Sequence, residues 1–532
     1  MTSLGQLFIA SLSNISLETQ EASAFRRVLI FSRTEFKFDN HFLEEDNLMT
    51  IAQRSEHITD AAKSTIGAGQ SFVILGGGIA GLATAYELLT RGCSVTLVEK
   101  GTEVGGLART FEQEGFRFDI GGHRFHSNNP TVVQWLKNLL KSDLLTVPRI
   151  SHIYLGGKFV NYPIKFPGAL SVFSPFKAVQ MVISYLTAKI TERGRLGFSF
   201  EDWVVKRYGR ALYEVFFEPY TEKVWGIPCS QLSSTWASQR IGIPSLWRMI
   251  KHAIAPPKNA PATAISEFYY PRAGFGMITE ELRAKIVAMG GVIHTSTSLS
   301  QLVPTQNGFH VTIQHQDGTV NTIATEQVVS TIPINFLLQA IPEELGSQKI
   351  LQQYDLEYRD LICLFVALKQ PQVSEDSWTY FPAKDFTFGR THEPKNWSHE
   401  MVPNDDFTSL AIEIFSSRGE ATWEMSDADI LNTVVEQMNQ IGWVEEKDVY
   451  KSWVMRVPYA YPVYRIGYEE KLKGVKDYLN QWNNLHLVGR TGSFHYMNSD
   501  GVIEDVFRLM EELFPKEASD VKPLAAATGR WM

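Results

Sequence analysis

A glycine-rich turn between two apolar runs constrains the fold of this chain most strongly. Residues 72–75 (FVIL) read as a buried strand, GGGIAG follows at 76–81, and Glu99 ends the next predicted strand, 94–98. A strand, a glycine turn, a helix and a second strand ending in an acid form a dinucleotide-binding βαβ unit. The sequence therefore predicts an α/β protein that holds a nucleotide cofactor.

Each glycine of this turn has its own expected task. Gly76 makes the tight turn, Gly78 lets the backbone approach a pyrophosphate, and Gly81 lets the helix pack closely on the strand. The N-terminal N–H groups of the helix face the phosphates, and the acid accepts hydrogen bonds from a ribose hydroxyl. We expect cofactor contacts from Gly76, Gly78, Ile79, Ala80, Gly81, Glu99 and Lys100.

A second glycine turn, GGLART at 105–110, follows soon after the acid. An NAD site has no need of it, whereas the pyrophosphate and ribityl chain of FAD continue past the first turn. The spelling VEK-x4-GGLART resembles the flavoprotein superfamily of amine oxidases, phytoene desaturases, protoporphyrinogen oxidases and UDP-galactopyranose mutases. FAD is therefore the expected cofactor, with further contacts from Gly106, Leu107, Ala108 and Arg109.

Composition excludes several other classes of protein. The net charge is −8 and the chain has no Lys/Arg-rich block, so we expect no nucleic-acid partner. Its three cysteines form no CxxC pair and its histidines no HExxH pattern, which argues against disulfides and metal. No stretch reaches the roughly 18 apolar residues of a membrane span, and residues 1–12 lack a basic region. We expect a cytoplasmic protein without stable membrane insertion, and leave its oligomeric state open.

The order of predicted elements indicates a discontinuous FAD-binding Rossmann-like domain with two additions. A helical insertion interrupts it, and an antiparallel β-sheet domain supplies the expected substrate surface. Residues 1–69 read as an extension, with Met49 as an alternative start, and 516–532 as a tail. The predicted ranges are 70–150, 270–345 and 480–515 for the FAD domain, 165–265 for the helical insertion, and 151–164 with 350–479 for the sheet domain.

Two further segments are expected at the flavin ring. Two glycines precede His123, which suits close approach of backbone to a flat ligand, although a lone histidine can also be purely structural. Near the other end, Ser499 or Asp500 is the expected N-cap of a last helix, whose N-terminus would stabilise negative charge on a reduced flavin. Arg490 adds a positive charge there, unless it forms a surface salt bridge. The remaining expected cofactor residues are Gly121, Gly122, His123, Leu299, Arg490, Asp500, Gly501 and Val502.

Four segments resemble motifs of the UDP-galactopyranose mutase family, and they occur along this chain in the same order as in that family. They are YTEKVWG at 220–226, GGHRFHS at 121–127 (similar to a GPHIFHT-type segment), YPVY at 461–464, and GRTGSFHYMNSD at 489–500 (similar to GRLGxYxYLDMD). Asn498 stands where that last motif has an acid, and Phe494 where it has a tyrosine. By contrast, GGLART and the YPRAGFG segment at 270–276 are more similar to the oxidase and desaturase branch of the superfamily.

The resemblance implies a ring-contracting isomerase that acts on a nucleotide-diphosphate sugar. In that family N5 of reduced flavin attacks the anomeric carbon, so an external reductant or reductase must reduce the FAD. Arginines suit the diphosphate because the guanidinium binds phosphate oxygens in bidentate fashion. Carried over, His123, Arg240, Arg390, Tyr461 and Tyr496 are the catalytic residues, and Tyr220, Trp225, Arg240, Arg390, Tyr461 and Tyr496 bind substrate.

Two other functions stay open. A flavin oxidoreductase, an oxidase or desaturase, would use the same cofactor residues while N5 accepts a hydride. A non-catalytic FAD-binding or partner-binding protein would need only the first motif. Likewise Trp225 can be a core residue, and Arg240 and Arg390 can be solvated surface charges.

Overall fold

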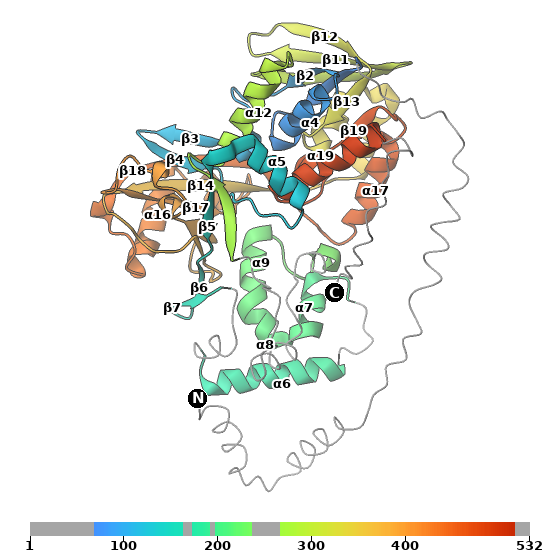
Figure 1. The fold of residues 1–532 in the computed structure, drawn as a ribbon. Coiled ribbons are helices and arrows are strands. Elements are labelled where there is room, and N and C mark those ends of the chain that lie inside the picture. The colour runs from blue at the N-terminus through green and yellow to red at the C-terminus, as the bar shows by residue number, and fades with distance from the viewer. Residues whose placement is uncertain (1–68, 163–172, 192–196, 237–265, 516–532) are drawn as a thin grey trace. The chain divides into compact units, whose positions relative to one another are not determined.

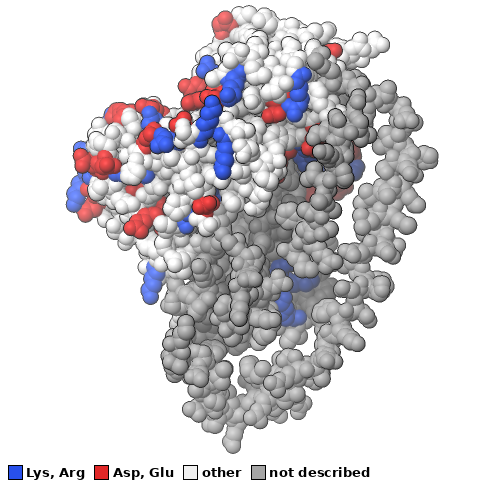
Figure 2. All heavy atoms as spheres, in the orientation of Figure 1, with Lys and Arg blue, Asp and Glu red and all other residues white. Residues whose placement is uncertain are grey.

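The computed structural model describes residues 69–162, 173–191, 197–236 and 266–515. All of them belong to one compact unit, residues 65–532. The expectations for the extension at 1–69 and for the tail at 516–532 fall almost wholly outside the described residues. No described helix is long and apolar enough to cross a membrane. On the face shown in Figure 2, basic and acidic side chains are interspersed.

A five-stranded parallel sheet forms the predicted nucleotide-binding core. Its order is β19-β13-β1-β2-β9, so the first two strands of the motif lie at its centre. Figure 1 shows strands from distant parts of the chain meeting in this sheet. The strands are β1 (Ser71–Leu75), β2 (Ser94–Val98), β9 (Val292–His294), β13 (Gln327–Ser330) and β19 (Leu485–Leu487). The expected α/β fold is confirmed.

Both faces of the parallel sheet are covered, as the unbroken apolar sequence of β1 requires. Phe72 and Ile74 pack toward the helices of one face, whereas Val73 and Leu75 pack into a second core. That second core also includes the meander β10-β11-β12, whose predicted hairpin is present. The elements are α4 (Ile79–Leu89), α5 (Pro130–Leu140), α12 (Met277–Ala288) and α19 (Ser499–Leu513) on the first face, and β10 (Thr297–Thr305), β11 (Gly308–His315), β12 (Val320–Thr325) and α13 (Ile334–Ala340) on the second.

A seven-stranded sheet forms the second layer system, in the order β18-β14-β17-β16-β15-β6-β7. Its pairs are antiparallel except for the parallel pair of β15 with β6. The helix α16 (Asp427–Gln440) packs in the core on one face of this sheet. The strands are β6 (Ser151–Leu155), β7 (Lys158–Asn161), β14 (Tyr358–Leu368), β15 (Trp378–Tyr380), β16 (Arg390–His392), β17 (Thr408–Ile414) and β18 (Val449–Pro462).

The described part of the predicted insertion is helical. A π-helical turn, Tyr213–Phe217, leads into α9, which carries the YTEKVWG segment and ends at Gly226 with φ +67°. The Cβ of any other residue at Gly226 would lie 2.6 Å from the Arg359 guanidinium, so this position requires glycine. The helices are α6 (Pro175–Thr191), α7 (Phe200–Tyr208), α8 (Arg210–Leu212) and α9 (Glu218–Trp225).

The remaining elements connect these layers. Residues 485–490, expected to be one strand, divide into β19 and a short helical turn, because Gly489 adopts φ +81° and ends the strand. The connecting elements are β3 (Thr110–Gln113), β4 (Phe116–Asp119), β5 (Leu144–Pro148), β8 (Glu267–Pro271), α14 (Ser347–Gln353), α15 (Ala421–Glu424), α17 (Tyr468–Leu479) and α18 (Gly489–Gly492).

Candidate functional site

A first cavity of about 690 Å³ opens where β1 and β2 end. The glycine turn after β1, the acid after β2 and the second glycine turn all line it, as the sequence predicts. Most of the expected cofactor residues therefore lie around one space. The lining includes Gly76, Gly78, Ile79, Ala80, Glu99, Lys100, Gly106, Leu107, Ala108, Arg109, His123, Leu299, Arg490 and Val502.

Each glycine of the first turn has a different structural role. Gly76 has φ +100°, which makes the turn. A Cβ added to Gly78 would meet no atom within 4 Å, so its backbone faces open space. A Cβ added to Gly81 would lie 1.9 Å from the carbonyl oxygen of Gly76, so this glycine serves the packing of α4. Gly81 accordingly does not line the cavity.

The Glu99 carboxylate ties the first glycine turn to the segment that follows β2. One oxygen accepts a hydrogen bond from Gly77 N at 2.6 Å and the other from Gly101 N at 2.7 Å. Each carboxylate oxygen has a second lone pair. Because the side chain also lines the cavity, it can still accept from a ribose hydroxyl.

A second cavity of about 440 Å³ meets the first at five shared residues. Of the expected residues, Gly121, Gly122 and Asp500 line this second cavity and not the first, and Gly501 lines neither. Arg240 lies in 237–265, outside the described residues. The shared residues are Leu107, Ile120, His123, Arg490 and Ser499.

His123 and Arg490 occupy the junction of the two cavities. Burial, and then the Arg490 charge, lowers the pKa of His123 to about 4, so the ring is neutral near pH 7. Arg490 donates to the carbonyl oxygen of Met497 at 2.8 and 3.0 Å, and its guanidinium lies over the rings of Tyr461 and Tyr496. These contacts hold a positive charge inside the molecule, which argues against the surface salt bridge considered for Arg490.

The expected cap of the last helix is wrong. The helix α19 begins at Ser499, and its N-cap is Asn498, whose side chain makes no capping hydrogen bond. Gly501 lines neither cavity because it faces Met497: a Cβ added to it would lie 3.2 Å from the Cβ of Met497. The first backbone N–H groups of this helix lie beside Arg490, at the junction of the two cavities.

The second cavity is walled by aromatic and charged side chains. Tyr220 and Trp225 come from α9, and Tyr461 and Tyr496 stack on each other with ring centroids 5.7 Å apart. Burial raises the pKa of both Tyr220 and Tyr461, so these phenols stay protonated and can donate. Trp225 is also a buried core residue, in contact with Trp236.

Arg390 is already paired. Its guanidinium makes a bidentate ion pair with Glu413, at 2.9 and 2.6 Å, and Glu413 also accepts from Gly122 N at 2.8 Å. Although burial opposes it, the Glu413 charge raises the pKa of Arg390 above its ordinary value. Arg390 therefore reaches the cavity with its charge largely neutralised, and is not the solvated surface charge considered as its alternative.

Comparison with known proteins agrees with this geometry. Residues 79–505 match the family described as flavin containing amine oxidoreductase. The chain belongs to this family. It therefore binds FAD, and the predicted flavoprotein superfamily is confirmed.

Individual relatives divide between two chemistries. Over 290 residues the chain is 26% identical to protoporphyrinogen oxidase 1, chloroplastic, of Arabidopsis thaliana. This match covers 49% of this chain and 52% of the relative. Over 177 residues it is 25% identical to a probable UDP-galactopyranose mutase of Klebsiella pneumoniae, covering 31% and 44%. The chain thus spans about half the length of these relatives.

The fold agrees with a solved structure, that of reduced UDP-galactopyranose mutase. The TM-score is 0.71 at 20% identity, and the match covers 84% of this chain and 93% of the other. At that identity the likeness concerns the fold. It confirms the predicted combination of a parallel and an antiparallel sheet.

The first cavity of this amine oxidoreductase family member fits FAD. Open space at Gly78 lets a pyrophosphate approach the backbone, and buried Nε of Arg109 has no hydrogen-bond partner among the described residues. An arginine with an unused donor at a glycine turn suits a phosphate oxygen. The junction beside His123 and Arg490 is where the ring end of the cofactor would meet the second cavity.

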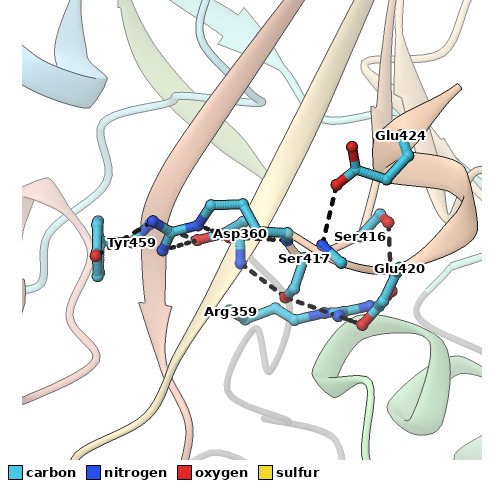
Figure 3. A network of polar contacts seen from close by, with 9 residues as sticks. Arg359, Asp360, Ser416, Ser417, Glu420, Glu424 and Tyr459 are labelled. Carbon is cyan, nitrogen blue, oxygen red and sulfur yellow. Dashed lines mark hydrogen bonds and ion pairs between the residues drawn. The ribbon is translucent and has the colours of Figure 1, made fainter. Parts of the chain in front are cut away.

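Figure 3 shows a network of polar contacts that includes Tyr459, a residue of the first cavity's lining. Tyr459 lines that cavity and, unusually for a tyrosine, has φ +58°. The buried carboxylate of Asp360 accepts from Tyr459 N at 2.7 Å and pairs with Arg418 at 2.9 Å. Arg418 in turn lies over the Tyr459 ring. No sequence motif indicated this support.

Lys223 fastens two walls of the second cavity to each other. Its Nζ lies 2.5 to 3.1 Å from four carbonyl oxygens, those of Phe381, Ala383, Phe386 and Phe388. The helix that carries Tyr220 and Trp225 is thereby bound to the segment between β15 and β16.

Sequence reasoning missed several residues of the second cavity. Trp378 and Tyr380 belong to β15, a strand of three residues without any motif, and His392 ends β16. Arg124 lies within the GGHRFHS segment and could have been found there, next to the histidine that drew attention.

Proposed function

We propose that this FAD enzyme is a mutase that contracts the sugar ring of a nucleotide-diphosphate sugar. The observation that carries the proposal is the second cavity, which joins the FAD cavity at His123 and Arg490 and is lined by arginines and tyrosines. An oxidase or desaturase of an apolar substrate has no use for such a lining. The likeness to the probable mutase of Klebsiella pneumoniae supports the same substrate class.

Bound and reduced FAD supplies a nucleophilic N5 for the anomeric carbon. The protein's own side chains then hold the leaving diphosphate. The protonated phenols of Tyr461 and Tyr220 donate to phosphate oxygens, and Trp225 contributes an aromatic surface for the nucleotide base. Neutral His123 positions the ring end of the cofactor without adding a charge, while Arg490 keeps one positive charge nearby.

The FAD must arrive reduced, so we propose an external reductant or a separate reductase as a partner. The nucleotide sugar is the small-molecule partner, and the cytoplasm suits both. Tyr496, stacked on Tyr461 beneath Arg490, completes the proposed phosphate site.

A flavin oxidoreductase is the second candidate. The relative with the longer matched stretch of the two, protoporphyrinogen oxidase 1, favours it. So does the ion pair of Arg390 with Glu413, because a neutralised arginine binds phosphate less strongly. In addition, this chain has Asn498 at the position where the mutase motif has an acidic residue.

A spectroscopic assay tests the proposal. Purified protein is incubated with UDP-galactose before and after dithionite reduction, while flavin absorbance and the furanose product are followed. We expect product from the reduced protein alone, with no net flavin oxidation. A flavin that is inert toward UDP-galactose in both states rejects the mutase for this sugar, and bleaching by an oxidisable substrate would establish the second candidate.

A further inference from the structure

Arg124 is held so that its side chain enters the second cavity. Its neighbour Phe125 is fully buried, and the backbone of Phe125 exchanges two hydrogen bonds with Tyr269, at 3.0 and 2.8 Å. Adjacent side chains of an extended backbone point to opposite sides. Because Phe125 points into the core, Arg124 points away from it and lines the cavity.

The guanidinium of Arg124 rests on a rigid aromatic platform. Its Cζ lies 4.7 Å from the ring centroid of Trp378, which is 5% exposed. The indole N–H of Trp378 donates to the Tyr380 hydroxyl at 2.6 Å, which fixes the ring. Stacking on a fixed ring orients the planar guanidinium before any ligand binds.

Arg124 differs from the other arginines of the cavity in its hydrogen bonds. Arg390 is paired with Glu413, and Arg490 donates to backbone carbonyls. By contrast, Nη1 of Arg124 is buried without a hydrogen-bond partner, and no ion pair joins Arg124 to any described residue. A buried donor that stays unpaired has lost its hydrogen bonds to water, so a ligand that pairs with it gains affinity.

The charges near Arg124 favour an anion. Burial lowers its pKa to about 10, so it is charged at neutral pH. Arg149 and Arg390 add positive potential, whereas Asp500 is the nearby carboxylate, and burial raises the pKa of Asp500. With Glu413 neutralising Arg390, the cavity is lined by the two positive charges of Arg124 and Arg490 and the one carboxylate of Asp500, so the balance is positive.

We propose that Arg124 binds an oxyanion of the substrate, and is the residue that selects anionic substrates in the second cavity. The shared chemistry is a pair of oxygens facing one guanidinium edge, from the diphosphate or from a carboxylate on the sugar. The proposal rests on the proposed function in taking the second cavity as the substrate site.

The test compares Arg124→Gln, Arg124→Lys and Arg149→Gln with the wild-type holoprotein. Arg149 lies 5.6 Å from the same Trp378 ring but does not line the cavity, which makes it a matched control. Tryptophan fluorescence follows titrations with inorganic pyrophosphate, UDP-galactose and UDP-galacturonic acid. Bound flavin, measured by absorbance, verifies that each variant is folded.

If the oxyanion is the diphosphate, Arg124→Gln weakens pyrophosphate and UDP-galactose by ~10- to 100-fold. If it is a sugar carboxylate, only UDP-galacturonic acid is weakened. Arg124→Lys should recover part of the affinity, because the charge remains and the planar fork is lost. Arg149→Gln should change the affinities far less.

Unchanged affinities of Arg124→Gln for all three ligands would overturn the proposal, and so would a wild-type protein that binds none of them. The mutase assay is independent. Arginine-dependent binding of anions without ring contraction would retain the role of Arg124 and reject the proposed reaction. Ring contraction by Arg124→Gln at wild-type affinity would retain the proposed reaction and reject the role of Arg124.

Discussion

The two cavities are lined by different kinds of residue. At one end of the first cavity the lining consists largely of glycines and alanines from the turns that follow β1 and β2, and later segments such as 297–300, 331–340 and 455–459 complete it. The second is lined by aromatic and ionisable side chains that six or more distant segments contribute. A ligand of fixed chemistry such as FAD can be held by main chain and helix termini, whereas selectivity for a substrate requires side chains.

Replacing Gly78 should give the largest effect and confine it to the first cavity. Its φ of −71° suits any residue, and Asp is a good N-cap for α4. We expect Gly78→Asp to lower FAD affinity by ~100-fold or more through repulsion of the pyrophosphate, while the apoprotein keeps its stability within ~1 kcal/mol. Flavin content and thermal melts measure both quantities.

Gly81→Ala is the matched control for Gly78→Asp. Its Cβ would strike the carbonyl oxygen of Gly76, so we expect a loss of ~1–3 kcal/mol in the apoprotein itself. If Gly78→Asp were destabilised as strongly as Gly81→Ala, the first turn would be structural throughout and the comparison would fail.

Glu413→Gln should act on the second cavity with the next largest effect. The carboxylate is 1% exposed, and its loss leaves the half-buried Arg390 unpaired. We expect ~2–3 kcal/mol of destabilisation in urea unfolding, together with tighter binding of pyrophosphate, because the anion can replace the lost carboxylate. Destabilisation without any gain in pyrophosphate affinity would show that Arg390 does not face the ligand.

The histidines of the second cavity should make stability depend on pH. Burial lowers the pKa of His392 to about 3, from an ordinary value of 6.5. The stability from a neutral ring is thus complete above pH 6.5 and is lost as the pH falls toward 3. His392→Phe keeps the ring over Trp397 and should lose less stability on acidification, by on the order of 2–3 kcal/mol between about pH 6.5 and 4.

Urea unfolding across that pH range measures the difference between wild type and His392→Phe. Parallel curves for the two proteins would contradict the neutral, buried ring. Variants of the first cavity such as Gly78→Asp should follow the wild-type pH dependence, since they leave His392 unchanged.

Asp360→Asn should have the smallest effect and probes the side-chain support of the first cavity. It weakens the hydrogen bond that holds Tyr459 at φ +58° and the ion pair with Arg418. We expect ~1–2 kcal/mol of destabilisation and FAD affinity weaker by only a few-fold. Arg418→Gln, at a half-exposed arginine, should cost less. A complete loss of flavin in Asp360→Asn would mean that the first cavity depends on side chains as much as the second.

The sequence predicted the first cavity well because its signals are local. The strand, glycine turn and acid lie within 30 residues, and apolar runs as far away as 485–487 could be assigned to the same sheet. The pairing of Arg390 with Glu413 could not be predicted, because it depends on the register of β16 against β17. Nor could the N-cap of α19, since Asn498, Ser499 and Asp500 are all acceptable cap residues and packing selects among them.

The place of β19 in the parallel sheet bears on how the protein is made. This strand completes the sheet beside β13, and Arg490 just beyond it lines both cavities. Synthesis proceeds from the N-terminus, so neither cavity is complete until these late residues leave the ribosome. Until then the apolar β13 lacks one neighbour. We therefore expect FAD to bind fully only after synthesis has nearly finished, and its supply then to favour the finished fold over the aggregation of nascent chains.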